Sequence, residues 1–439
     1  MEPTPALAGR LRIVVAGWKG GGNVPPTISA VAALCARGHE VTVVADDSIA
    51  GDARAAGARF VGWKRAPNRP DRSAASCFVR DTELADPFAA FAAWCERIFV
   101  GPSEAQARDL IEVMTVQPTD VLVASDLLFG SVLAGEVAQL PTAILSTNVS
   151  ISPLPGHPPF GPGFLPAETA ADHERDRSVA AWAEEMWNGF LPGLNAARQA
   201  LGRKPLARVL DQLRAADLHL LATSPAFDYP AAALPPDVRY VGPLLDEPSW
   251  IAGGAAPVAA PPERPLVLVS FSTTDQGQSG ALETIISALG ELPVEAVVTL
   301  GNVLERFGAQ IPPNVRVLDS ASHEAILPHA ALVITHGGHG TTLRALRHGV
   351  PLLILPMGRD QNENAARVAY HGVGLRLDAA SAAPVIADAI ARLLWEPDFA
   401  TSARRMGEAL RAEPPAAERF VAAIEQLHAQ RRAHPTCAA

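Results

Sequence analysis

The stretch from Leu332 to Asn364 contains residues that could hold a negatively charged ligand. A short apolar strand, Leu332 to Thr335, runs into a His-Gly-Gly-His-Gly loop, and a helix carrying Thr341 in its first turn follows. Glycine lets backbone N–H groups approach a ligand closely, and a helix N-terminus carries partial positive charge. The pattern therefore predicts an anion-binding site, to which His336 adds a side-chain donor.

Polar side chains also follow the next buried strand, VPLLILP, which begins after Gly349. This strand ends in a loop of sequence GRDQN, residues 358–362. Ligands of open α/β sheets bind at the carboxyl ends of adjacent strands. Asp360 and Gln361 are therefore expected to bind hydroxyl groups beside the anion.

Two other interpretations of this stretch are open. His336 and His339 could be zinc ligands, but no third Cys, His or carboxylate stands at a recognisable spacing, so no metal site is predicted. A structural turn without a ligand is the second alternative. The long run of polar and glycine residues at two strand ends favours the ligand site.

The same residues carry a resemblance to a known family. HGGHGTTLRALRHGVPLLILPMGRDQNENAARV resembles the donor-binding signature of the inverting nucleotide-sugar glycosyltransferases of the UDP-glycosyltransferase superfamily, especially bacterial members that decorate antibiotics and other natural products. The resemblance implies a diphosphate held at the glycine loop and helix start, and sugar hydroxyls held by the Asp-Gln pair. The implied donor residues are His336, Gly338, Gly340, Thr341, Asp360 and Gln361.

The resemblance extends to the nucleoside part of the donor. Ser272 and Thr273 stand in a turn similar to the family's Phe-Gly-Ser turn near the diphosphate, although the glycine is missing. His323 falls where relatives carry a Gln that contacts the base, so it joins the predicted donor site. Arg344 stands where many members place a ribose-binding Glu, and the pattern leaves UDP and dTDP donors both open.

Two catalytic positions follow from the resemblance in the first half of the chain. GGGNVPP lines up with the family's Gly-His-Val-x-Pro loop, whose His is the general base, and places Asn23 at that position. An amide cannot take a proton at neutral pH. Asp126, at the end of the strand Asp120 to Ser125, matches the Asp that orients the family's catalytic His. Asp126 is therefore the preferred base. Two alternatives are that His157 is the base or that the acceptor is already acidic enough to need none. The structural interpretation of Asp126 is that it caps the helix that follows.

Alternating strands and helices must position these residues. Continuous apolar runs are typical of strands in parallel sheets, buried on both faces. Two series of such runs are separated by a stretch rich in Pro, Ala and Gly, which indicates an interdomain linker. The predicted strands are Leu11 to Ala16, His39 to Ala45, Ala58 to Trp63, Asp120 to Ser125, Pro141 to Ser146, Leu218 to Ala222 and Val238 to Val241, then Pro265 to Phe271, Glu295 to Leu300, Val315 to Leu318, Leu332 to Thr335 and VPLLILP.

The predicted fold class is α/β, with two facing Rossmann-like domains and parallel sheets, the GT-B architecture implied by the resemblance. We assign residues 1–243 to an acceptor-binding domain, 244–264 to the linker, 265–415 to a donor-binding domain and 416–439 to a terminal helix that crosses back. The Pro/Gly-rich loop from Ser152 to Ala167 is expected to form a wall of the acceptor site. NAD or flavin binding is disfavoured because GWKGGG puts Lys19 where GxGxxG needs its second glycine.

Composition excludes several function classes. The chain has 439 residues and a net charge of −10, which argues against nucleic-acid or acidic-membrane partners. No apolar run approaches the ~20 residues that span a bilayer, and the N-terminus lacks the order of a secretory signal. The 4 cysteines are widely spaced, without CxxC, as suits a reducing cytoplasm. A cytoplasmic protein is predicted, and a homodimer is left open.

The predicted activity is transfer of a sugar from a UDP- or dTDP-sugar to a mainly apolar small-molecule aglycone in natural-product biosynthesis. The nucleotide-sugar is a co-substrate, and no further cofactor is expected. Two alternatives stay open: a nucleotide-sugar epimerase of the same fold, and a catalytically silent partner protein that binds a nucleotide-sugar.

Overall fold

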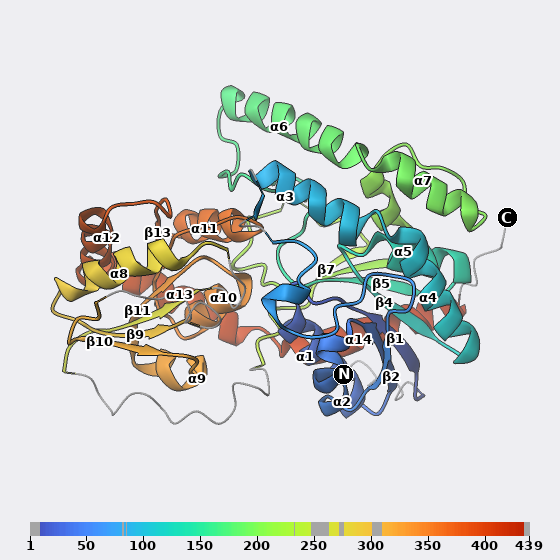
Figure 1. Cartoon of the computed structure of the whole chain (residues 1–439), viewed down its shortest axis with the longest axis horizontal. Coiled ribbons are helices and arrows are strands. Elements are labelled where there is room, and N and C mark those ends of the chain that lie inside the picture. The colour runs from blue at the N-terminus through green and yellow to red at the C-terminus, as the bar shows by residue number, and fades with distance from the viewer. Residues whose placement is uncertain are drawn as a thin grey trace, which may run out of the picture.

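Two sheets of parallel strands form the framework of the molecule, one in each half of the chain (Figure 1). The computed structural model describes residues 9–80, 83–84, 86–231, 233–246, 263–271, 276–300 and 310–433. Ser272 and Thr273, and residues 247–262 of the predicted linker, lie outside the described residues. The α/β class with two parallel sheets, predicted from the apolar runs, is confirmed.

The first sheet has seven strands in the order β3-β2-β1-β4-β5-β6-β7. β1 pairs with both β2 and β4, so the residues that follow β1 and β4 meet at one edge of the sheet. The strands are β1 (Arg12–Ala16), β2 (Glu40–Ala45), β3 (Arg59–Gly62), β4 (Val121–Ser125), β5 (Thr142–Ser146), β6 (Leu218–Leu221) and β7 (Val238–Tyr240).

Helices cover both faces of this sheet, because its strands are apolar on both sides. Residues of α4 and α5 pack on one face, and residues of α1 on the other. The helices of this half are α1 (Val24–Ala36), α2 (Ala50–Ala55), α3 (Pro87–Trp94), α4 (Ser103–Val116), α5 (Phe129–Ala138), α6 (Ala170–Asn188) and α7 (Leu191–Ala200).

The second sheet has six strands in the order β10-β9-β8-β11-β12-β13. α8 and α12 pack on one face, and α10, α11 and α13 on the other. The elements are β8 (Leu266–Ser270), α8 (Ser279–Gly290), β9 (Glu295–Thr299), β10 (Val315–Leu318), α9 (His323–Ile326), β11 (Ala330–Thr335), α10 (His339–Arg347), β12 (Leu352–Ile354), α11 (Gln361–Tyr370), β13 (Gly374–Arg376), α12 (Ala383–Trp395), α13 (Pro397–Ala412) and α14 (Ala416–Ala433).

The final helix, α14, leaves the second half of the chain and packs against α1 of the first (Figure 1). Phe420 and Ile424 are fully buried in a core cluster that also holds Leu11 and Leu34. Burying two such side chains contributes about 3–6 kcal/mol. α14 therefore completes the core of the first sheet.

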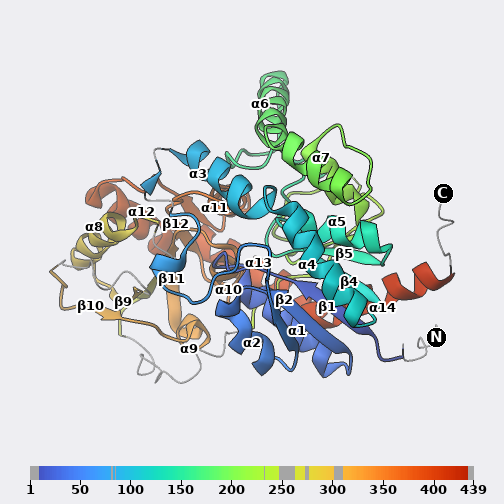
Figure 2. The same ribbon diagram turned by 45° about the vertical axis from the view of Figure 1, so that its right-hand side comes forward.

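One long helix of the first half carries almost no core. α6 has no buried residue and projects from the molecule beside α3 (Figures 1 and 2). A capping box fixes its start, since the Thr169 hydroxyl accepts from the Asp172 N–H and the Asp172 carboxylate accepts from the Thr169 N–H. Among the described residues, no helix combines the length and the apolar character needed to cross a bilayer.

Candidate active site

The glycine loop between β11 and α10 leaves the start of α10 open. Gly337 has φ +93°, and a Cβ there would lie 2.7 Å from the Ile354 side chain, so only glycine is accommodated. Gly338 is the N-cap of α10. A Cβ at Gly340 would have no heavy atom within 4 Å, so this face of the first turn is unobstructed. The first N–H groups of α10 have no partner within the helix itself and can therefore bind an anion.

His336 lies against this helix start as a neutral imidazole. The pKa of His336 is lowered to about 4, mainly by burial and also by the Arg359 guanidinium, against a hydrogen bond with the Ser270 backbone. A Cβ at Gly338 would be 2.8 Å from the ring Nε2, so the imidazole packs directly over that glycine. His336 can contribute a hydrogen bond to a diphosphate but not a full charge.

His339 has a different environment from His336. Its Nδ1 lies 3.1 Å from Asn364 Oδ1 and its Nε2 lies 3.4 Å from the Ala222 carbonyl oxygen, in the first half of the chain. Burial is the main cause that lowers its pKa. The two histidines thus have separate protein partners, and His339 links the two halves. Within the described ranges, no group of three or more His, Cys, Asp or Glu side chains is arranged to hold a metal ion.

Asp360 and Gln361 stand together at the start of α11, one strand away from the glycine loop. Asp360 is partly exposed, and its Oδ2 accepts a hydrogen bond from the Asn364 amide at 3.1 Å. Gln361 is 2% exposed, and both ends of its amide have protein partners: the Met357 N–H at 2.7 Å and the Gln276 Oε1 at 2.8 Å. Asp360 is therefore the more accessible partner for a sugar hydroxyl.

Asn23 fastens the loop that follows β1. Its Oδ1 accepts from the Gly20 N–H at 3.1 Å and its Nδ2 donates to the Trp18 carbonyl at 2.9 Å. Asn23 is the N-cap of α1, but its side chain makes no capping bond. Both ends of the amide thus hold the loop, which gives Asn23 a structural role in this arrangement.

Asp126 follows β4 at the same sheet edge and is 6% exposed. Burial raises its pKa to about 6, against the hydrogen bonds from the Ser146 and Ser125 hydroxyls. The next helix has Leu128 as its N-cap, so Asp126 does not cap it. Asp126 is thus a carboxylate whose proton affinity suits general-base chemistry near neutral pH.

His157, the other candidate base, has protein groups near both of its ring nitrogens. Its Nε2 lies 2.9 Å from the Tyr229 carbonyl oxygen and its Nδ1 lies 3.7 Å from Asp228 Oδ1. The side chain is 5% exposed, and burial is the main cause that lowers its pKa. His157 therefore anchors the loop 152–167 rather than facing a substrate.

A buried charged network joins the two halves beside the Asp-Gln pair. Glu363 accepts hydrogen bonds from the N–H groups of Gly161 at 2.8 Å and Gly163 at 2.9 Å, both in the loop 152–167. Its other oxygen pairs with Arg367 at 3.0 Å, and Arg367 pairs with Asp228 at 2.8 Å. The predicted acceptor-side loop is therefore fixed directly to the helix that begins with Gln361.

Arg359 makes a second connection between the halves. One of its N–H groups donates to the Gly20 carbonyl at 3.2 Å, and its guanidinium carbon lies 5.4 Å from the centroid of the Trp94 ring. Sequence reasoning missed both Arg359 and Glu363. The only signal for Arg359 was a basic residue directly before the Asp-Gln pair.

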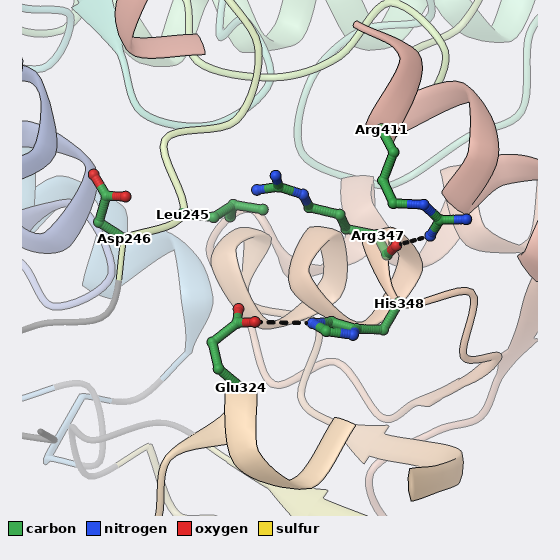
Figure 3. A pocket seen from close by; sticks show the side chains of 6 residues that line it. All are labelled: Leu245, Asp246, Glu324, Arg347, His348 and Arg411. Atoms are coloured by element: carbon green, nitrogen blue, oxygen red, sulfur yellow. Dashed lines mark hydrogen bonds and ion pairs between the residues drawn. The ribbon is translucent and has the colours of Figure 1, made fainter. Parts of the chain in front are cut away.

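The nucleoside side of the predicted site contains an unexpected carboxylate. Arg344 donates to the Leu245 carbonyl at 2.7 Å and pairs with Glu324 at 3.2 Å, and Glu324 also lies 2.9 Å from His348 Nε2. His323 begins α9, next to Glu324. Figure 3 shows the adjoining pocket of about 500 Å³, which is lined by Leu245, Asp246, Glu324, Arg347, His348 and Arg411.

The sequence is similar to proteins of natural-product biosynthesis. Residues 283–427 match the family model "Erythromycin biosynthesis protein CIII-like, C-terminal domain". The 4'-demethylrebeccamycin synthase of Lentzea aerocolonigenes is 29% identical over 428 residues, which cover 95% of this chain and 98% of that protein. The TDP-daunosamine transferase of Streptomyces peucetius is 35% identical over 218 residues, 46% of this chain and 50% of that protein.

The fold likeness spans nearly the whole chain. The solved structure of the glycotransferase of kitacinnamycin superposes with a TM-score of 0.75 at 21% identity, covering 95% of this chain and 99% of that one. This likeness concerns the fold, whereas the two sequence relatives are named as a synthase and a TDP-daunosamine transferase. The chain is thus similar in sequence to these biosynthetic proteins, and it shares the fold of the kitacinnamycin glycotransferase over nearly its whole length.

Proposed function

We propose that this glycosyltransferase moves a sugar from a nucleotide-diphospho-sugar to a small, mainly apolar aglycone, with inversion at the anomeric carbon. The observation that carries the proposal is the unobstructed start of α10 beside His336 and Asp360. Helix N–H groups suit a diphosphate, and the partly exposed carboxylate of Asp360 suits sugar hydroxyls one strand away.

Aromatic side chains of the first half, some packed on its core and others exposed, support an apolar acceptor. Trp18 contacts Trp94 edge-on at 5.5 Å between ring centroids, and Phe91 contacts Trp187 in the same manner at 4.8 Å. Phe88 is 54% exposed although its ring lies 5.1 Å from that of Trp182. We infer that α3, α6 and the loop after β1 form the acceptor wall, because exposed aromatic groups favour an apolar ligand.

In this proposal the two substrates meet between the strand ends of the two sheets. The acceptor atom attacks the anomeric carbon in line with the departing nucleoside diphosphate, whose charge the helix dipole of α10 and the His336 hydrogen bond would stabilise. Contacts such as Glu363 with Gly161 hold the two halves together, which would limit water entry and donor hydrolysis. No metal ion is required in this scheme.

The test uses the purified full chain with UDP-glucose, dTDP-glucose and a panel of aromatic aglycones, analysed by mass spectrometry. We expect a glycoside product, and the anomeric proton coupling in its NMR spectrum should show the configuration opposite to that of the donor. Rearranged nucleotide-sugar without acceptor consumption would instead identify the epimerase alternative. Bound but unreacted donor with every acceptor would contradict the transferase proposal.

A further inference from the structure

Arg359 holds an unfavourable backbone conformation at the junction of the two halves. Its φ is +56°, and Gln139 is the other non-glycine residue with positive φ in the described part of the chain. The left-handed region disfavours an L side chain, and such conformations cluster at functional sites. Here the preceding Gly358 and the turned Arg359 direct a guanidinium across to the first half, just before Asp360 begins the sugar-binding segment.

The guanidinium lies among the groups that would surround the reacting atoms. In the second half of the chain, its charge lowers the pKa of His336, which is neutral. Arg359 also directly precedes Asp360 in the sequence. On the first half it contacts Gly20, in the loop fastened by Asn23, and the face of Trp94.

Lys19, the other basic residue near Gly20, has a different environment from Arg359. It precedes Gly20, but its charge interacts with Arg69 and Arg72, which, after burial, lower its pKa to about 8. Arg359 itself is exposed, so a ligand can reach it.

A tether between the halves does not by itself explain Arg359. Its bond to Gly20 is long and lies at the surface, whereas the halves are already joined by the buried pair of Arg367 and Asp228. Arg376 offers a comparable exposed tether, donating to the Gly163 carbonyl at 3.3 Å. The position over Trp94, on the aromatic acceptor wall, distinguishes Arg359 from that residue.

We propose that Arg359 binds the acceptor and stabilises its anion, so that the substrate class is phenols, enols and comparably acidic compounds rather than aliphatic alcohols. This inference rests on the proposed glycosyl transfer. Asn23 offers no base, and a guanidinium beside a developing oxyanion makes deprotonation easier.

The acceptor proton passes to the Asp126 carboxylate and then to solvent. The freed electron pair on the acceptor oxygen forms the bond to the anomeric carbon, and the bond from that carbon to the phosphate oxygen breaks with its electrons on the nucleoside diphosphate. A phenol ionises near pH 10, and an opposite charge nearby lowers that value by about one to three pH units, which brings it toward the pKa of Asp126, about 6.

The test compares wild type, Arg359→Met, Arg359→Lys and the control Arg376→Met. The first readout is the absorbance titration of bound 4-methylumbelliferone, whose phenolate absorbs at longer wavelength. Wild type and Arg376→Met should lower the pKa of bound 4-methylumbelliferone by about one to three pH units. Arg359→Lys should keep part of this shift, and Arg359→Met should abolish it. A wild-type enzyme that leaves the ionisation unchanged, or an Arg359→Met protein that titrates like wild type, would overturn the inference.

The second readout is kcat/KM for glucosylation of fluorinated and unfluorinated 4-methylumbelliferone and of an aliphatic alcohol, with dTDP-glucose and UDP-glucose. Arg359→Met should lose most with the least acidic phenol and least with the most acidic one. An equal loss with all phenols would indicate a merely structural role. Transfer that favours the alcohol refutes the inference and leaves the proposed function intact, whereas a shifted ionisation without any transfer refutes the proposed function alone.

Discussion

Replacing Asp126 by Asn should lower activity and, at neutral pH and above, raise stability relative to acidic pH. As the proposed base, Asp126 contributes about 10² to 10⁴ in rate, so Asp126→Asn should lose that factor in kcat/KM at pH 7–8. The loss should shrink once the pH exceeds the ionisation of the acceptor, because the acceptor then needs no base. In wild type, kcat/KM should fall below about pH 6, where the carboxylate becomes protonated.

The stability effect follows from burial of the same carboxyl group. Its pKa is raised from 3.8 to about 6, so between these values the folded protein binds more protons than the unfolded chain, and stability falls as the pH rises. A difference of about 2 pH units corresponds to about 3 kcal/mol, which wild type loses between pH 4 and pH 7. Asn carries no charge, so the stability of Asp126→Asn relative to wild type should improve by that amount over the same range.

Urea unfolding of both proteins at several pH values between 4 and 8 measures this difference. Asp120→Asn is a matched control at the other end of the same strand, because the hydrogen bond from Arg12 lowers the pKa of Asp120. Asp120 contributes stability that is present above its unfolded pKa and is lost only as the pH falls through its lower folded pKa, so the difference between wild type and Asp120→Asn should stay nearly constant from pH 4 to pH 8. A stability difference between wild type and Asp126→Asn that is independent of pH would refute the burial argument, and unchanged turnover would refute the base assignment.

Three further predictions concern the donor side. A nucleoside diphosphate at 100 times its Kd should stabilise wild type by about 2.7 kcal/mol and raise its melting temperature by several degrees, and His336→Ala should largely abolish that rise in a thermal shift assay. Asp360→Ala should lower transfer while leaving the Kd for the bare diphosphate unchanged in calorimetry, because only the sugar hydroxyls lose a partner; an equal loss of diphosphate affinity would place Asp360 elsewhere. Transfer by protein dialysed against EDTA should equal that of untreated protein, and recovery of a lost activity with Mg²⁺ would show that the helix start does not suffice for the diphosphate.

The framework was predictable because buried parallel strands appear in the sequence as continuous apolar runs. β1 and β4 were located within a residue of their observed bounds. β13 was missed because it has three residues, one of them glycine and one arginine, and it becomes a strand only by pairing with β12. α13 was missed because only Glu396 separates it from α12, so no loop sequence marks its start.

The site was predictable where backbone geometry demands a residue type and not where partners are distant in sequence. The glycine loop before the helix was predicted from its composition, and Gly337 in that loop has positive φ. The spacing of Glu363 and Arg367 is that of an ordinary ion pair on a helix surface. Nothing in the local sequence indicates that Arg367 also pairs with the buried Asp228, 139 residues away. The same limit applies to Gln361, whose partner Gln276 is 85 residues away.

The return of α14 to the first sheet has a consequence for building hybrid enzymes. A chimera joined within the linker takes its first sheet from one parent and Phe420 and Ile424 from the other, so a core cluster is assembled from mismatched halves. Misfit side chains in a core commonly cost about 1–3 kcal/mol each. A hybrid with three segments, in which the terminal helix comes from the parent of the first sheet, should yield more folded protein than one with a single junction.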